Sequence, residues 1–553
     1  MNGEVWNILK HCVNPLFAAR LTLFFLRRIF FSLQYRYLPT VLYHSKEVKK
    51  LCKGIRSKAF TAPLSLKSEI GMSEVKGRLK LASGFLEFRS EADWKQKFDD
   101  SEQAMSLHRW NWLLYEDMSL DTGLRLMRSW LSVMDVVPRG LAHTSYTTGE
   151  RIVSALLFFH KKKVSIPEDI RGALLAMAFH VARHLEYHGV RGTGNHVINN
   201  ARALFFAGEV LDAPQFSELA LAVMKEALPW LVTQDGFLRE ESSHYHILFT
   251  RWLLEIYELA KATHHEEMTD FMGLWAKQCA KQCWFFLVQN SETAKWQIPL
   301  FGDVSPDCTP EWLIEYLLPK IAEYKEAQEA QNLKVFPQSG WFRLDRAPYT
   351  LFWHVPQEGM VHRATHGHSD LCSFVLYARG KPVFIDPGRP TYKTHDPLYE
   401  YSGSARSHNS LTLDGFDPTL YDRAQKFPVF YQKREVKCEW RDQGQWFMFA
   451  ISHTGFHRLN GDRIDHTRRF SIAHNSFEIE DEFSGKGSHT IETFFHFAPG
   501  RENIALYNSQ GQPQSIGGWT SPAYGVTVPS KVVAVKTKEK FPAKVRHRFE
   551  LLE

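Results

Sequence analysis

The sequence predicts an α+β protein of more than one domain, with an N-terminal (α/α) toroid followed by an antiparallel β-sandwich. The chain has 553 residues, which is several times the usual size of one domain. Hydrophobic residues recur with a helical period over residues 106–330 and with a period of two after Val335. The composition is 44% hydrophobic and 23% charged, which excludes a disordered, collagen-like or polytopic membrane protein. We therefore expect an N-terminal extension over residues 1–100, a toroid domain over 101–335 and a β-sandwich domain over 336–553.

The N-terminal extension is expected to be helical to about residue 60 and irregular from there to about residue 94. Its segment from Pro15 to Phe31 is apolar and aromatic, but Arg20, Arg27 and Arg28 interrupt it. A membrane-spanning helix needs about 20 apolar residues with few charges, and a signal peptide needs an uninterrupted apolar run. We therefore expect no transmembrane span, but an amphipathic helix that packs on the body of the protein or makes a peripheral membrane contact.

Helix start signals recur through the toroid domain. Thr147–Glu150 and Ser165–Glu168 have the spacing of a capping box, and Thr309 precedes a proline at a first helical position. Many consecutive helices of similar length indicate paired helices in an arc or toroid. The expected helices cover residues 119–136, 148–162, 167–188, 195–210, 214–231, 239–262, 266–289 and 309–332.

Short alternating runs bounded by Gly, Pro, Asn and Asp follow in the last third of the chain. Period-two alternation with β-branched and aromatic residues is typical of strands in an antiparallel sandwich. The expected strands are Phe374–Tyr377, Pro382–Ile385, Ser410–Leu413, Trp446–Ile451, Ser476–Ile479, Thr490–Phe497 and Lys531–Val535.

Charge and composition narrow the classes of function. With 67 Lys and Arg against 61 Asp and Glu, the formal net charge is +6, too small an excess for a dedicated nucleic-acid binder. Aromatic residues make up 14% of the chain, which fits either a deep core or a sugar-stacking cleft. The seven cysteines show no CxxC or zinc-finger spacing, so we expect free, structural thiols. The chain contains neither a Walker motif nor a GxGxxG motif, and we expect no nucleotide or redox cofactor.

Two polar clusters on expected helices are candidates for catalysis. Asn195, His196 and Asn199 stand at the start of a helix, where an amide and an imidazole favour an anion; the alternative is a capping Asn with a buried His. Tyr245 lies among polar neighbours on an otherwise apolar helix, and its phenol could move a proton; the alternative is a core or rim aromatic.

A third cluster suits a metal ion. His366 and His368 are two residues apart, so on a strand they would point to the same face. Two imidazoles and a carboxylate from separate strands suit zinc, so we expect His368, Asp386 and His408 to bind one; the alternative is a histidine cluster that serves packing alone. The members of this histidine-rich region are His362, His366, His368, Asp370, Asp386 and His408.

Together these blocks resemble the heparinase II/III family of polysaccharide lyases. The matching pieces, in order, are Gly194-Asn195-His196 with Asn199-Asn200, Asp235-Gly236 with Ser242 and Tyr245-His246, His366-Gly367-His368 with Asp370, Asp386-Pro387-Gly388, and His408-Asn409-Ser410-Leu411. The resemblance extends over about residues 100–500. It implies an alginate-lyase-like helical toroid and a heparinase II/III-like C-terminal domain, with a cleft between them and an acidic polysaccharide as substrate.

The resemblance also implies roles for single residues. Asn195 would neutralise the uronate carboxylate, His196 and Tyr245 would handle protons, and His366 would face the same cleft. His368, Asp386 and His408 would hold a structural zinc ion. It further implies a periplasmic or cell-envelope location, although the first 35 residues show no clear export signal, which leaves a cytoplasmic location open.

β-Elimination requires a group that neutralises the uronate carboxylate and groups that transfer protons. The C5 proton of a uronic acid is removed only if its carboxylate is neutralised, and an acid must protonate the leaving O4 oxygen. If both transfers occur on one face of the sugar, Tyr245 alone can serve as base and acid; if not, His196 takes the proton and Tyr245 donates one.

Two other functions compete with a lyase. A glycoside hydrolase would need a carboxylate pair, for which Asp235, Glu240 and Glu241 are the candidates, but adjacent helical residues point about 100° apart. The other alternative is a non-catalytic protein that binds or assembles a capsule or O-chain polysaccharide on the same fold.

Overall fold

A computed structural model gives the structure of the chain. The described residues are 12, 14–16, 18–26, 46–57, 77–115, 118–134, 140–187, 193–325, 333–355, 366–420, 434–459, 463–474, 476–501 and 506–550.

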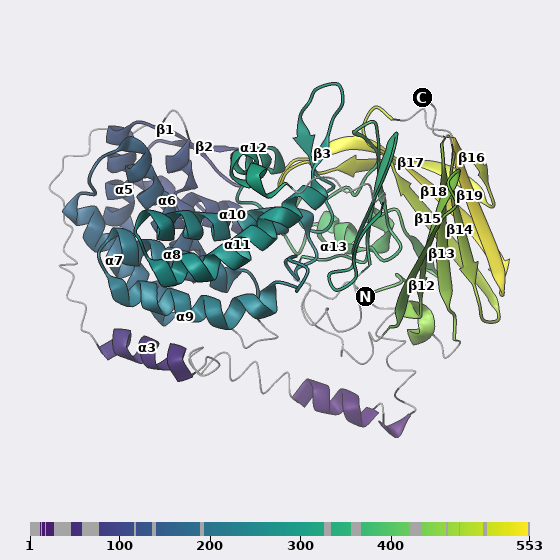
Figure 1. Ribbon diagram of the computed structural model, residues 1–553, viewed down its shortest axis with the longest axis horizontal. Helices are drawn as coiled ribbons and strands as arrows, with labels where there is room; N and C mark the ends of the chain where they lie inside the picture. Colours follow the sequence, from purple (N-terminus) through teal and green to yellow (C-terminus); the bar gives the residue numbers. More distant parts are fainter. Residues whose placement is uncertain are drawn as a thin grey trace.

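The molecule has a helical half and a sheet half, which lie side by side (Figure 1). The predicted order of a helical region followed by antiparallel sheets is confirmed. The helices are α3 (Lys46–Ser57), α4 (Ser101–Arg109), α5 (Leu120–Val133), α6 (Ser145–Lys162), α7 (Glu168–Arg183), α8 (His196–Val210), α9 (Pro214–Leu231), α10 (Ser243–Ala262), α11 (Glu266–Phe286), α12 (Pro310–Ile321) and α13 (Pro397–Gly403).

The helical half is built from two rows of helices. In the inner row α4, α6, α8, α10 and α12 pack one against the next, while α7, α9 and α11 pack behind α6, α8 and α10. The inner helix α6 is buried at every position from Ser145 to Leu156, because it has helices on several sides and needs no polar face. This is the packing expected for paired helices in an arc.

Two predicted capping boxes are wrong, and one predicted helix start is confirmed. Helix α6 begins earlier than expected, after Thr144, whose side chain accepts from the Thr147 amide. Helix α7 begins after Pro167, which has no side-chain acceptor to offer. At α12, the Thr309 side chain accepts from the Trp312 amide and Pro310 occupies the first turn, as predicted.

The sheet half contains three antiparallel sheets of five, six and four strands, ordered β5-β6-β7-β8-β9, β11-β12-β13-β14-β19-β16 and β10-β15-β18-β17. The strands are β5 (Leu333–Phe336), β6 (Trp341–Arg346), β7 (Tyr349–His354), β8 (Val375–Ala378), β9 (Lys381–Phe384), β10 (Leu411–Leu413), β11 (Val436–Asp442), β12 (Trp446–His453), β13 (His466–Ala473), β14 (Ser476–Phe483), β15 (Ser488–His496), β16 (Leu506–Ser509), β17 (Gln512–Thr520), β18 (Val528–Lys540) and β19 (Ala543–Glu550). All seven predicted strands are present, with ends shifted by a few residues.

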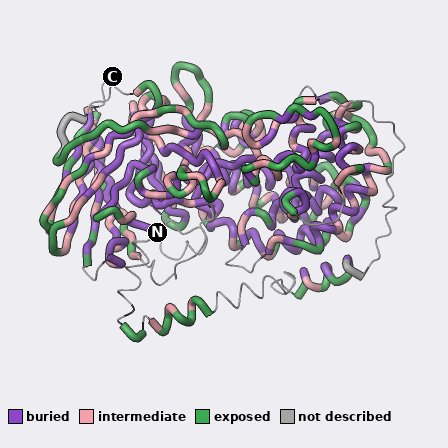
Figure 2. Tube along the Cα trace, turned by 180° about the vertical axis from the view of Figure 1, so that it is seen from behind, coloured by how far each residue is buried: buried purple, intermediate pink, exposed green. Residues whose placement is uncertain are grey.

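The five-stranded sheet is buried on both faces. Trp341 and Phe352 belong to the core that it shares with the helices, whereas Phe342 and Trp353 belong to the core that it shares with the six-stranded sheet. Because successive strand residues point to opposite faces, this sheet joins the two halves of the molecule. Figure 2 shows the resulting buried interior running through both halves.

The N-terminal extension is helical at residues 18–26 and in α3, as expected, but the irregular connection predicted up to residue 94 is wrong in part. Residues 77–88 form a hairpin of β1 (Gly77–Lys80) and β2 (Phe85–Phe88), and residues 58–76 lie outside the described part. Among the described residues, no helix combines the length and the apolar character needed to cross a membrane. Leu23, Phe25 and Leu26 are exposed, and the peripheral membrane contact stays a prediction.

Candidate active site

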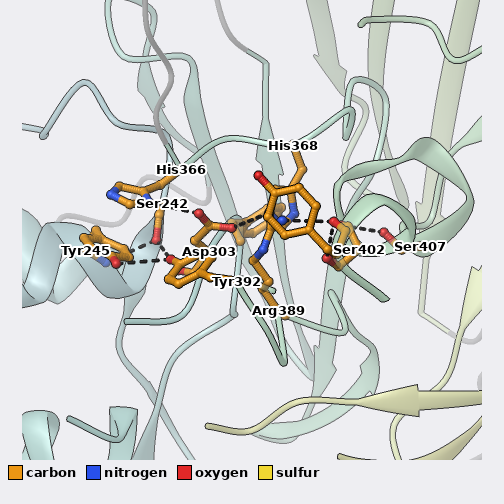
Figure 3. Close-up of polar contacts among 12 residues, drawn as sticks. Ser242, Tyr245, Asp303, His366, His368, Arg389, Tyr392, Ser402 and Ser407 are labelled. Carbon is orange, nitrogen blue, oxygen red and sulfur yellow. Dashed lines mark hydrogen bonds and ion pairs between the residues drawn. The ribbon is translucent and has the colours of Figure 1, made fainter. Parts of the chain in front are cut away.

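Most of the predicted site residues gather where the helical half meets the five-stranded sheet. They come mainly from the start of α8, the start of α10 and a loop before β8. A loop after β4 (Trp296–Gln297), from which no site residue was predicted, meets them there. Figure 3 shows the centre of this region, with Tyr245 and His366 on one side of Asp303 and with His368 and Arg389 on the other.

Tyr245 and His366 form a stacked pair. Their ring centroids are 3.5 Å apart and their planes differ by 12°. Ser242 caps α10 by accepting the Tyr245 amide at 3.1 Å, which fixes the first turn on which Tyr245 stands. The Tyr245 hydroxyl lies 3.1 Å from the hydroxyl of Tyr392, a residue that the sequence analysis missed.

Asn195 reaches the same pair from α8. Its backbone N–H and its Nδ2 donate to the two carboxylate oxygens of Glu240, at 2.7 and 2.5 Å. The Nδ2 atom also lies 3.3 Å from Nε2 of His366. The alternative of a capping Asn is wrong, because the Asn195 side chain makes no hydrogen bond to its own helix. It contacts Glu240 and His366 instead.

The His196 side chain has other hydrogen-bond and ring partners, although His196 follows Asn195 directly in the chain. Its Nδ1 lies 3.1 Å from a carboxylate oxygen of Glu186, and its ring packs 4.4 Å from the ring of Tyr146. His366 thus contacts both Asn195 and Tyr245, whereas the contacts of His196 are with Glu186 and Tyr146. Asn199 is fully buried and accepts from Arg202 at 3.0 Å, so it serves the packing of the helices.

Burial and nearby charges shift the pKa values of Tyr245 and His196. Burial and the carboxylate of Asp303 raise the pKa of Tyr245 well above its ordinary value, against the opposing effect of the Tyr392 hydrogen bond. Partial desolvation lowers the pKa of His196, but the carboxylates of Glu186 and Glu240 outweigh it, so the pKa is raised. Tyr245 therefore keeps its proton at neutral pH, and the positively charged form of His196 is favoured.

Asp303 is the residue with the most contacts to the predicted site that the sequence did not indicate. Its Oδ2 accepts from Nδ1 of His366 at 2.9 Å, and its Oδ1 accepts from Nε2 of His368 and from Nη1 of Arg389, both at 2.9 Å. In the sequence, Asp303 follows Gly302, which signals a turn and nothing more. Only the fold brings Asp303 into contact with His366 and His368.

The three predicted metal ligands lie together. His368, Asp386 and His408 are all buried, and one ligand atom of each lies within 4.8 Å of the others. The prediction that the ligands stand on strands is wrong. All three lie outside the strands: Asp386 is two residues after β9, His408 is three residues before β10, and His368 is in the longer loop before β8. Asp370, their predicted neighbour, is 3.6 Å from His354 instead, and His362 lies outside the described residues.

Ring orientations in this cluster fit a metal ion. Asp386 accepts from Nδ1 of His408 at 2.9 Å, which leaves Nε2 as the lone-pair nitrogen. This Nε2 is buried and has no hydrogen-bond partner among the described residues. Asp303 likewise accepts from Nε2 of His368, so the lone pair of the His368 ring lies on Nδ1. Two nitrogens and a carboxylate oxygen are a donor set that zinc prefers.

A second buried cluster contains Cys372, His453 and His466. Its ring nitrogens are engaged in a chain: the Gly455 amide donates to Nδ1 of His453, whose Nε2 lies 2.8 Å from Nδ1 of His466. Nε2 of His466 then lies 2.8 Å from Asp481. These hydrogen bonds account for the cluster without a metal ion.

The carboxylates considered for a glycoside hydrolase do not form a pair. Glu240 is bound by Asn195, and Asp235 accepts from the amide and the hydroxyl of Ser339. Glu241 is buried in another direction, where it interacts with His354 and Asp370. The hydrolase alternative is therefore not favoured.

Comparison with known proteins identifies the family. The model of the heparinase II/III N-terminus matches residues 139–329, and the model of the heparinase II/III-like C-terminal region matches residues 328–544. The heparin-sulfate lyase of Bacteroides thetaiotaomicron is 21% identical, over 74% of this chain and 63% of its own length. The chain thus spans less than two thirds of that relative.

Solved structures show the same fold. The crystal structure of heparinase III has a TM-score of 0.64 at 16% identity, covering 82% of this chain and 78% of its own. A mutant of the heparan sulfate lyase HepC from Pedobacter heparinus has a TM-score of 0.57 at 14% identity, covering 91% and 87%. With both halves of the fold and the ordered motifs matched, the chain belongs to the heparinase II/III family.

Proposed function

We propose that this protein is a polysaccharide lyase that cleaves a uronate-containing acidic polysaccharide by β-elimination. The observation that carries the proposal is the stacked pair of Tyr245 and His366 with the amide of Asn195 at its edge. These groups provide an acid, a base and a carboxylate ligand at one point of the junction between the two halves.

In the proposed reaction, Nε2 of His366 takes the C5 proton of the uronate. The electron pair of the broken C5–H bond forms the C4–C5 double bond, and the C4–O4 bond breaks. Tyr245 donates its proton to the leaving O4 oxygen. This assignment follows from the raised pKa of Tyr245, since a phenol that keeps its proton serves better as the acid than as the base.

Asn195 and His196 are assigned to the carboxylate of the uronate. The Asn195 amide lies 3.3 Å from Nε2 of His366, so a carboxylate bound there brings its own C5 close to the proposed base. The raised pKa of His196 favours its positively charged form, which stabilises the developing enolate and is poorly suited to act as the base.

The relative named heparin-sulfate lyase supports this reaction class and an acidic substrate. It also argues against the alternative of a non-catalytic protein that binds or assembles polysaccharides. We further propose that His368, Asp386 and His408 bind one zinc ion, which would tie together the loops that carry them.

The test is a screen of purified protein against uronate polymers: heparan sulfate, chondroitin sulfate, hyaluronan and alginate. Elimination leaves a conjugated double bond, so we expect ultraviolet absorbance to rise with one of them. The control is the same polymer with its carboxylates reduced to alcohols, which should not be cleaved because Asn195 and His196 would have no anion to bind. Equal turnover of the native and the reduced polymer would exclude uronate elimination.

A further inference from the structure

We infer that Asp303 is the positioning residue of this active site, holding His366 in the tautomer whose Nε2 carries the lone pair. The inference rests on the proposed lyase function and deepens it. Asp303 does not touch the substrate in this assignment; it acts through His366, as the buried carboxylate of a hydrolytic triad acts through its histidine.

The side-chain contacts of Asp303 set the tautomer. A carboxylate can only accept, so the 2.9 Å contact between its Oδ2 and Nδ1 of His366 requires the ring proton at Nδ1. On the other edge of the ring, the Asn195 amide is a donor and lies 3.3 Å from Nε2. The carboxylate oxygen Oε2 of Glu240 lies 3.6 Å from Nε2, beyond hydrogen-bond distance. The two hydrogen-bonded neighbours, Asp303 and Asn195, therefore favour one tautomer, with Nε2 as the acceptor.

The backbone of Asp303 positions the rest of the pair. Its N–H donates to the carbonyl of His366 at 2.9 Å, and its carbonyl accepts from the Ser242 hydroxyl at 2.8 Å. Ser242 in turn caps the helix that carries Tyr245. Asp303 thus positions both stacked rings. Its side chain and its backbone N–H hold His366, and its carbonyl holds Ser242, which caps the helix of Tyr245.

Asp303 also connects the active site to the proposed metal site. Its Oδ1 accepts from Nε2 of His368, while Nη1 of Arg389 donates to the same oxygen. The side chains of Asp303, His368 and Arg389 are fully buried, and Arg389 supplies the positive charge that a buried carboxylate needs. Figure 3 shows this carboxylate between the two histidines.

The experiment compares Asp303→Asn with a matched control, Asp481→Asn. Asp481 is also fully buried and accepts from one histidine, His466, and one arginine, Arg468, but it lies in β14 within the sheets. The same loss of a buried charge occurs in both variants, and only Asp303→Asn changes the partner of His366. Both variants are assayed on the polymer that the wild type cleaves, heparan sulfate first.

We expect Asp303→Asn to lower kcat by about 10²- to 10⁴-fold, as for a histidine held in the wrong tautomer, with KM within about threefold of the wild type. Asp481→Asn should lose thermal stability and keep its kcat. Equal kcat values for Asp303→Asn and the wild type, or equal losses in both variants, would overturn the inference.

A second measurement needs neither activity nor a variant of Asp303. In protein labelled with ¹⁵N-histidine, the ring signals of His366 are identified by their loss in His366→Gln. We expect a protonated Nδ1 and an unprotonated Nε2, and the opposite pattern would disprove the role of Asp303. Should the wild type cleave no uronate polymer, the proposed function fails while this measurement still decides the tautomer.

Discussion

At the scale of single residues, Tyr245 gives the sharpest prediction. Replacing Tyr245 with Phe keeps the ring that stacks on His366 and removes the proton donor. We expect turnover to fall by roughly 10² to 10⁴, with little change in polymer binding, because the hydroxyl acts mainly in the transition state. Steady-state rates and a melting curve check this.

The alternative role for Tyr245 predicts a different result. As a packing residue it would lose only its contact with the Tyr392 hydroxyl, at a cost of about 1 kcal/mol in stability and with near-normal turnover. A folded Tyr245→Phe enzyme with wild-type rates would remove Tyr245 from the catalytic set.

Glu241 yields a prediction about pH. Burial raises the pKa of this carboxyl from 4.5 to about 6, and the electrostatic interaction with His354 offsets only part of that rise. The folded state therefore binds the proton more tightly than the unfolded state does. Its contribution to stability is fully present below pH 4.5 and is lost as the pH rises through about 6.

Glu241→Gln keeps the shape of the side chain and removes this dependence. Relative to the wild type, we expect its free energy of unfolding to gain roughly 2 kcal/mol between pH 4.5 and pH 7.5, from about 1.36 kcal/mol per pKa unit. Urea unfolding of both proteins at several pH values measures the difference. A difference that does not vary with pH would show that Glu241 titrates normally.

Among the structural elements, the loop that contains Gly302 approaches the loop of His366 very closely. Its φ is +70°, and a Cβ there would lie 2.5 Å from the carbonyl oxygen of His366 and 2.7 Å from that of Glu241. Gly302→Ala must therefore push the His366 loop away from Asp303, in addition to straining its own backbone.

Gly84→Ala is the control for backbone strain alone. Gly84 has φ +80°, and nothing lies within 4 Å of its added Cβ. We expect this control to cost about 1 kcal/mol and to keep its activity. Gly302→Ala should lose more stability and most of its turnover. Similar melting temperatures and rates for the two variants would contradict the close approach.

At the scale of the whole molecule, the proposed zinc site predicts stoichiometry. Elemental analysis should find about one zinc ion per chain in the wild type and none in His408→Ala, because His408 supplies a buried ligand nitrogen. Cys372→Ser should keep its zinc, since the ring nitrogens near Cys372 are already paired with one another. Two ions per chain, or an unchanged content in His408→Ala, would refute this assignment.

Loss of zinc should lower the melting temperature, because the ligands come from loops that the ion would join. The structure adds a second expectation, since His368 shares Asp303 with His366. Stripped protein should therefore also lose turnover at temperatures where it is still folded.

Periodicity in the sequence is sufficient to predict the order of the two halves. Periodicity predicted the helices and seven of the strands, because local alternation decides which side of an element is buried. Residue type made Asn195, Tyr245 and the ligand triad candidates, because polar and titratable clusters of this kind are common at functional sites. The resemblance to the heparinase II/III family supplied the roles proposed for Asn195, Tyr245 and His366.

The partners of these residues depend on how the elements pack. Asp303 and His366 are 63 residues apart in the chain, and Asn195 and Glu240 are 45 apart, so no local pattern relates them. Asn195 and His196 are neighbours in sequence, yet their side chains have different partners, Glu240 for one and Glu186 for the other. Periodicity fixes the direction of a side chain relative to its own element, whereas the approach of distant loops depends on how the elements pack, and that packing created the Asp303 network.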